Sequence, residues 1–260
     1  MRQVPVKNFL PQNCPDSGGV SELKEQPEYS SWNYGRLYSS GVLEDVSVTT
    51  HGLQFSISRE TLVNDAVAEI AAMFQALGNA AALHAAESIA AALEDTSNLS
   101  DGAPYFGTAT SNLMESRSGG GAPSTATLDL GAARLWRMPV GEHIAGSAPH
   151  FVVVPPELQM STKALVASTY DPAGTSGTLR AGRIDTVVLP HLTSAKNWYL
   201  LGDPVAAPAL AMLHLAGGTG EVTMLERITV PHRDGITLRL RTDYNIARVS
   251  RNGAIKVESP

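Results

Sequence analysis

Histidines are the residues of this sequence best suited to metal binding or proton transfer, but their spacing matches no ligand motif. The seven histidines include no HExxH or HxH pattern, so spacing alone sets up no shared metal site. His143 and His150 flank a Gly-Ser pair in an expected loop and are the best candidates for a metal or acid–base role. His84 lies in an alanine-rich stretch, where a place on a helix face is the simpler interpretation. We therefore predict no metal centre.

The other residue types that carry chemistry also lack their usual context. The sequence has no Gly-x-Ser-x-Gly nucleophile motif, and the glycine run at residues 119–121 is not followed by the Lys-Ser/Thr of a phosphate-binding loop. Cys14, the single cysteine, has no basic neighbour that would favour a reactive thiolate. Glu94 and Asp95 adjoin at the expected end of a helix, where a polar stop is the simplest role. We predict no catalytic residue and no cofactor, and hence a protein that is not an enzyme.

One charge pattern stands out near the C-terminus. Residues 227–260 carry a net charge of +4, whereas the rest of the chain carries −10. Arg239 and Arg241 alternate with leucines, so they share one face of an expected strand. This face is either simply solvated or meets an acidic surface of an identical neighbour in a head-to-tail contact.

Composition supports a folded chain whose surface is poor in charge. Of the 260 residues, 43% are hydrophobic, and no apolar run is long enough to span a bilayer. Charged residues make up only 17%, against about 25% in ordinary soluble domains. The net charge of −6 argues against a protein whose main role is to grip nucleic acid. A single cysteine and the lack of a signal peptide indicate a reducing, cytoplasmic origin.

The N-terminal third is expected to be extended. Residues 1–29 contain four prolines among polar residues and predict an arm that is either disordered or laid across another surface. The next segment predicts a hairpin, with strands near residues 46–48 and 53–57 and a turn at residues 50–52. A two-stranded ribbon is marginal alone, so this hairpin needs a partner surface.

The rest of the chain predicts one long helix, an α/β region and a closing ribbon. Apolar residues at three- and four-residue steps predict a thin, alanine-rich helix at about residues 60–94, with a bend at Gly78–Asn79, on the order of 50 Å long. The α/β pattern that follows consists of helices at 128–136 and 157–168 and strands at 151–154, 184–189 and 198–201. Asn252–Gly253 predicts a tight turn between strands at 246–249 and 255–257.

Several short phrases, taken in order, resemble a known family. Residues 55–65 read FSISRETLVND, which is similar to the entry into the long helix in the Mu-like phage major head subunit group. Leu99–Gly102 with Tyr105 and Phe106, the run 152–157, and 197–200 with 203–204 also look like segments of that group. Over about residues 50–250, the chain therefore resembles the major capsid proteins of tailed bacteriophages, which have the HK97-type fold.

This resemblance implies an α+β protein with five parts. They are an N-terminal arm (1–29), an extended loop hairpin (30–58), a peripheral domain (59–138) with the long spine helix, an axial α/β domain (139–226), and a C-terminal β-ribbon that returns to the peripheral domain (227–260). Contacts between subunits are expected along the hairpin and the ribbon. The candidate residues are Trp32, Tyr34, Arg36, Leu53, Phe55, Arg239 and Arg241.

The implied function is structural. Such subunits assemble as hexamers and pentamers into an icosahedral shell around double-stranded DNA, in the host cytoplasm, and end in the virion capsid. The implied partners are copies of the chain itself, a scaffolding protein and maturation protease, a portal at one vertex, a decoration or cement protein, and DNA bound without specificity; no membrane is involved. An encapsulin-like compartment is the alternative, and a soluble hydrolase using His143 or His150 is a remote one.

Two further expectations concern the arm and the loop. Some members of the fold join neighbours through a lysine–asparagine isopeptide bond, but residues 30–58 contain no lysine. We therefore expect non-covalent locking or a decoration protein. We also expect that a chain lacking its first 28 residues folds as a monomer but forms no closed shell.

Overall fold

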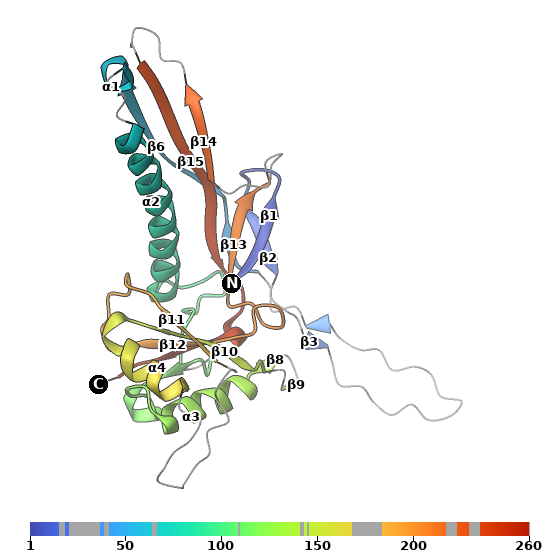
Figure 1. Ribbon diagram of the computed structural model, residues 1–260. Coiled ribbons are helices and arrows are strands. Elements are labelled where there is room, and N and C mark those ends of the chain that lie inside the picture. The colour runs from blue at the N-terminus through green and yellow to red at the C-terminus, as the bar shows by residue number, and fades with distance from the viewer. Residues whose placement is uncertain are drawn as a thin grey trace.

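A long β-ribbon with a helix beside it extends from a compact α/β body (Figure 1). The computed structural model describes residues 1–15, 19–20, 37–38, 42–63, 67–108, 110–140, 143–144, 146–167, 184–216, 223–228 and 235–259. Helices and strands mix in both parts, so the expected α+β class is confirmed.

The ribbon is organised around one strand, β15 (Gly235–Arg248). On one edge, β15 pairs antiparallel with β6 (Thr49–Ser58) over the whole length of β6. On the other edge, its first half pairs with β14 (Thr223–Ile228) and its second half with β13 (Leu210–Leu215). Along β15, Leu238 and Leu240 alternate with Arg239 and Arg241, a pattern that suits a strand in a sheet whose two faces have different surroundings.

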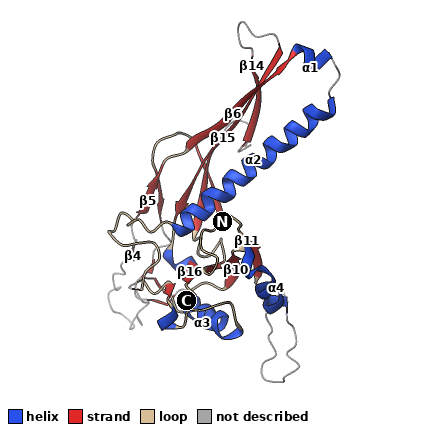
Figure 2. Cartoon of the chain, turned by 90° about the vertical axis from the view of Figure 1, so that its left-hand side faces the viewer, coloured by secondary structure: helices blue, strands red, loops and turns tan. Residues whose placement is uncertain are grey.

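The predicted long helix is present beside the ribbon. It comprises α1 (Arg59–Val63) and α2 (Val67–Glu94), separated by three residues that the structure does not describe. Helix α2 continues through Gly78, where a bend was expected, and both views show it running along the ribbon (Figures 1 and 2). Its last turns are buried at Ala90 and Leu93, where the ribbon meets the body.

The body is a five-stranded sheet with helices packed against it. In spatial order its strands are β11 (Asp185–Val188), β10 (Pro149–Val154), β12 (Trp198–Gly202), β16 (Ala254–Val257) and β7 (Leu113–Met114). The helices are α3 (Thr125–Trp136) and α4 (Gln159–Ala167). These elements confirm the α/β region predicted from the sequence.

A dense apolar core joins this sheet to its helices. Trp198 and Leu200 on β12 are fully buried, and they pack with Leu128 and Leu135 from α3. The indole Nε1 of Trp198 donates a hydrogen bond to the carbonyl oxygen of Gly121 at 2.9 Å, which satisfies the one polar group of this buried side chain. The body is therefore a rigid base from which the ribbon projects.

The first residues of the chain belong to the sheet of the ribbon. Strand β1 (Arg2–Val6) pairs in parallel with β13, and Val6 is buried in a small core with Val46, Val48 and Leu213. The expected arm therefore begins with a strand that is anchored in its own subunit. Removal of the first 28 residues would uncover the edge of β13 as well as any surface between subunits.

Several short elements complete the chain. Paired strands lie between β1 and β6 and after α3: β2 (Gln12–Pro15) with β5 (Val42–Val46), β3 (Gly19–Val20) with β4 (Leu37–Tyr38), and β8 (Pro139–Val140) with β9 (His143–Ile144). The described residues also form three single 3-10 turns, η1 (Ser116–Ser118), η2 (Pro156–Leu158) and η3 (Arg251–Gly253).

The predicted turn at residues 50–52 is wrong. Strand β6 runs straight through these residues, and its partner is β15 rather than the segment around residue 46. Gly52 is needed for close approach, since a Cβ there would lie 2.8 Å from the carbonyl oxygen of Leu240. The extended pairing before the helix is instead made by β2 with β5 and β3 with β4.

This pairing changes the argument about lysine. The segment enclosed between β3 and β4 includes Lys24, which the range 30–58 left out. The sequence therefore gives no ground for excluding a covalent link through this segment.

The predicted hairpin at Asn252–Gly253 is also wrong. The chain turns through η3 and leaves the ribbon, and β16 pairs antiparallel with β12 and parallel with β7. A Cβ on Gly253 would lie 2.0 Å from the carbonyl oxygen of Ala207, so glycine is required here by a neighbouring backbone. The C-terminal segment thus links the ribbon to the body.

Candidate functional site

The candidate site is the surface of the ribbon and its helix. Arg239 and Arg241 point to the same face of β15, as predicted, because they are two residues apart in a continuous strand. Arg239 is exposed and forms no ion pair with any residue that the structure describes. Arg241 is partly buried, which sets it apart from its neighbour.

Arg241 is already paired within its own chain. Its Nη2 lies 3.7 Å from Oε1 of Glu226 on β14, and its Nε lies 3.2 Å from Oδ2 of Asp243. This face of the ribbon therefore alternates positive and negative side chains instead of presenting a block of one sign. Such an arrangement gives little net field but can fix the register of a partner.

The positive charge counted along residues 227–260 is also largely neutralised in three dimensions. Besides Arg241, three of its basic side chains have carboxylate partners in the chain: Arg248 with Glu44 and Asp95, Arg251 with Asp101, and Lys256 with Glu258. Among the described residues of the segment, Arg227 and Arg239 remain exposed. The contrast between a basic ribbon and an acidic remainder is thus weaker than the sequence indicated.

Leu53 and Phe55 lie on the opposite face, toward α2. In the β6–β15 register they stand opposite Leu240 and Leu238. The ring of Phe55 meets Phe74 of α2 edge-on, with centroids 6.3 Å apart, whereas Leu53 is 55% exposed. Phe55 therefore holds the helix to the ribbon. The candidates Trp32, Tyr34 and Arg36 lie outside the described residues.

The first half of α2 presents apolar side chains to solvent. Residues 70–86 contain no Asp, Glu, Lys or Arg over nearly five turns. Met73 is 52% exposed and Leu83 57%, and Leu225 of β14 is also exposed. Contiguous exposed apolar surface is typical of sites that interact with another molecule. The sequence showed the absence of charge, but the helical pattern alone did not show that this half would lie uncovered.

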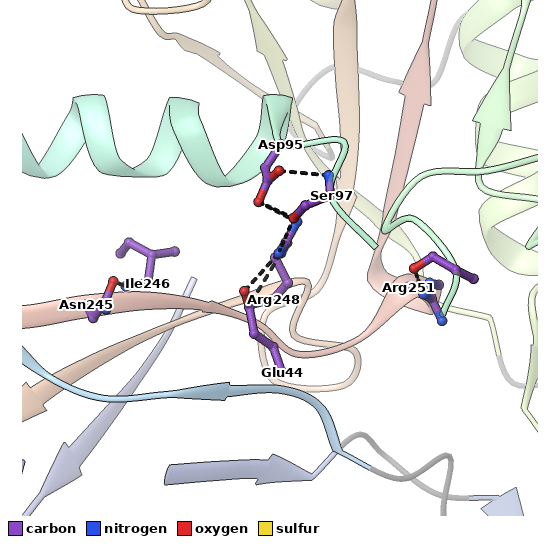
Figure 3. Close-up of polar contacts among 8 residues, drawn as sticks. Glu44, Asp95, Ser97, Asn245, Ile246, Arg248 and Arg251 are labelled. Carbon is purple, nitrogen blue, oxygen red and sulfur yellow. Dashed lines mark hydrogen bonds and ion pairs between the residues drawn. The ribbon is translucent and has the colours of Figure 1, made fainter. Parts of the chain in front are cut away.

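A buried arginine fixes the junction at the other end of the ribbon. Figure 3 shows Arg248, at the end of β15, between Glu44 and Asp95. Its Nη2 donates to Oε1 of Glu44 at 2.8 Å, its Nε to Oε2 at 3.2 Å, and its Nη1 lies 3.0 Å from Oδ2 of Asp95. Its side chain is only 5% exposed, so these carboxylates are essential partners.

Each partner of Arg248 comes from a different element. Glu44 belongs to β5, at the base of the extended strand pairs, and Asp95 follows the last residue of α2. The backbone N–H of Ser97 holds the pKa of Asp95 below its ordinary value, and Arg248 adds to this effect. The cluster ties the extended segment, the helix and the ribbon to one point. Sequence reasoning missed it, since its members are up to 204 residues apart.

The described geometry does not support a metal or acid–base role for His143 or His150. His150 is exposed and packs edge-on against Phe151, while the side chain of His143 lies outside the described residues. In the part of the chain that the structure describes, no group of three or more His, Cys, Asp or Glu residues could hold a metal ion. Likewise, none of the described helices is both long and apolar enough to cross a membrane.

Comparison with known proteins decides the family. A family model described as phage capsid protein matches residues 43–257, which include the ribbon, the helix and the body. The chain belongs to this phage capsid family. No curated protein matches its sequence.

Solved structures show which fold this capsid protein has. The capsid of the cyanophage P-SCSP1u matches with a TM-score of 0.59 and 10% identity, covering 100% of this chain and 86% of that one. The head of Helicobacter pylori bacteriophage KHP40 matches at 0.57 and 9% identity, covering 100% and 87%. The SrpI encapsulin of Synechococcus elongatus PCC 7942 matches at 0.59 and 10%, covering 99% and 84%. The predicted HK97-type fold is confirmed.

The Arg248 cluster yields a prediction about the stability of this capsid protein. Replacement of Arg248 by alanine leaves two carboxylates without their cation, so we expect the free energy of unfolding to fall by about 3 kcal/mol. Arg239→Ala, at an exposed position of the same strand, should change it by less than about 0.5 kcal/mol. Guanidinium unfolding followed by tryptophan fluorescence measures both. Equal effects of the two substitutions would contradict this role of the cluster.

Proposed function

We propose that this chain is the major head protein of a tailed phage, which assembles as hexamers and pentamers into an icosahedral shell around double-stranded DNA. The observation that carries the proposal is the family match across residues 43–257. The exposed stretch of α2 at residues 70–86, which contains no Asp, Glu, Lys or Arg, supports it, because such a surface is unfavourable in a free chain and favourable between copies. Many repeated contacts of this kind stabilise a shell even when each is weak.

The finer assignment is to the Mu-like major head subunits. Its support is the phrase at residues 55–65, whose described part, up to Val63, covers the end of β6 and α1. The predicted five domains and their boundaries stay part of this proposal. So do the contacts between subunits at Leu53, Phe55, Arg239 and Arg241, and at the candidates outside the described residues.

The partners follow from the proposed role. A shell of this kind needs a scaffolding protein and a maturation protease during assembly in the host cytoplasm, and a portal at one vertex. A decoration or cement protein is an optional addition on the outside. Packaged DNA is held without sequence specificity, which agrees with the net charge of −6.

An encapsulin-like compartment is the second candidate. It is favoured by one observation, the TM-score of 0.59 with the SrpI encapsulin, which equals that with the cyanophage capsid. The two candidates share a fold and differ in what the shell contains and in whether one vertex is special.

Cryo-electron microscopy of particles purified from the producing cells tests the proposal. We expect closed shells with DNA density and a portal at a single vertex. Shells filled with a protein cargo, with twelve equivalent vertices, would instead identify the encapsulin-like compartment. A chain that remains monomeric or dimeric in size-exclusion chromatography would contradict both.

Arg239 provides a test of the ribbon as a contact between subunits. We expect Arg239→Glu to slow assembly at low salt and the defect to shrink as ionic strength screens the contact. Light scattering during assembly at several salt concentrations measures this. Arg239 is preferred to Arg241, whose reversal would also break the ion pairs with Glu226 and Asp243.

Lys163 on α4 provides the matched control, because it is exposed and lies on the body. Lys163→Glu makes the same change in net charge and should leave the assembly rate unchanged. If Arg239→Glu assembles at the normal rate too, Arg239 belongs to a solvated face.

A further inference from the structure

Two histidines meet where α2 lies against the ribbon. His51 is on β6 and His84 is on α2, and their ring centroids are 4.4 Å apart. Tyr244 of β15 completes the cluster, with its ring 5.2 Å from that of His51 and 5.9 Å from that of His84. Both imidazoles are half-buried and line a small pocket with Leu53 and Leu240. The function described above uses none of these three polar side chains.

The hydrogen bonds around the pair assign a neutral tautomer to each ring. Ser88 donates its hydroxyl proton to the carbonyl oxygen of His84, so it accepts from the Tyr244 hydroxyl at 3.1 Å. The Tyr244 oxygen is then left to accept from Nδ1–H of His84. Thr49 likewise donates to the carbonyl oxygen of Tyr244, so it accepts from Nε2–H of His51 at 2.9 Å.

Every hydrogen bond of the cluster is therefore complete while both rings are neutral. A second proton on either ring would occupy the remaining nitrogen, Nδ1 of His51 or Nε2 of His84. Among the described residues it would find no hydrogen-bond acceptor there, and the two rings would become like charges at close range. Protonation of both rings thus opposes the contact between helix and ribbon by charge repulsion, while the hydrogen bonds of the neutral cluster stay intact.

Charged groups around the pair come from each neighbouring element. On β15, Asp243 attracts a charged His51, but its carboxylate also pairs with Arg241. On α2, Glu87 lies 3.9 Å from Nδ1 of His191. On β13, His214 stands opposite Tyr244 and is a further basic group. Burial, followed by repulsion from His84, lowers the pKa of His51 in spite of Asp243.

Two other contacts flank the cluster along α2. Phe74 meets Phe55 further out along the helix, and on the inner side Ala85, Ala86 and Ile89 begin the packing against the core. The histidine cluster is therefore well placed to control whether this half stays attached. We propose that the His51–His84 pair is a proton-sensitive joint that is closed when both rings are neutral and opens when both are protonated. The joint lies within one chain, so it does not depend on the proposed shell.

The direction of the pH effect follows from linkage. A histidine whose pKa is lowered in the closed state binds more protons when the joint opens. The stabilisation of the closed joint by neutral His51 is complete above about pH 6.5, the ordinary pKa of histidine, and is lost as the pH falls below that value. Glu94, Asp95 and Asp101 have lowered pKa values, so their contribution is lost only below about pH 4. The two effects are thus separated on the pH scale.

Hydrogen exchange of the full chain at pH 7.5 and 5.5, corrected for the intrinsic rate, tests the joint. We expect protection of peptides from β6 and from α2 before Ala90 to fall about tenfold or more at pH 5.5. Peptides from β10 and β12 should not change. His51→Gln and His84→Gln, made separately, each remove one charge of the pair, and each should abolish the loss of protection at pH 5.5.

Two histidines elsewhere provide controls. His150→Gln, on β10, and His191→Gln, which removes the ion pair of His191 with Glu87, should keep the acid response. His84→Gln also alters the bond to Tyr244, so His51→Gln, which leaves that bond intact, decides the result if His84→Gln fails to fold. An unchanged acid response in His51→Gln, its loss in His191→Gln, or equal protection of the wild type at both pH values would overturn the proposal.

Discussion

The structure depends on β15, a single strand of 14 residues that takes part in both halves of the molecule. Its first part is paired on both edges, by β6 and β14, and forms the middle of the projecting ribbon. Its last part pairs with β13 and contributes Tyr244 and Ile246 to the core at the junction. Because a paired strand resists bending, the ribbon and the body are held as one unit.

Arg248 closes this arrangement at the end of the strand. Its guanidinium joins the end of α2 to the base of the extended segment, and the chain then continues into the sheet of the body. The joint at His51 and His84 lies further out, where the helix contacts the ribbon only along one side. The molecule thus combines a base fixed by a buried ion cluster with a helix whose outer half is largely exposed.

The low proportion of charged residues has a structural explanation in these terms. Many of the charged side chains near the C-terminus form ion pairs within the chain, such as Arg241 with Asp243 and Arg251 with Asp101. Residues 70–86 of α2 carry none. What remains is a surface suited to contact with copies of the same chain, and the family match makes that interpretation specific.

The sequence predicted what depends on local periodicity and failed where distant segments meet. The apolar repeat from Val67 to Leu93 predicted α2, and the valines before Pro155 predicted β10. The sequence pattern predicts turns at Gly52 and Gly253, but each glycine is required by a backbone from a remote segment, at Leu240 and Ala207. Such contacts leave no periodic signal.

For the candidate site, too, local patterns could be predicted from the sequence and contacts between distant segments could not. The shared face of Arg239 and Arg241 could be predicted, because alternation along a strand is local. The pairing of Arg241 with Glu226 and the Arg248 cluster could not, since their partners are brought together only by the fold.

Hydrogen exchange measured on the unassembled chain and on purified particles tests the central claim most directly. If the uncovered surface is an interface between subunits, assembly should protect α2 before Ala90 and the strands β6 and β14, while β10 and β12 stay as protected as before. Identical exchange of α2 in both states would contradict the account.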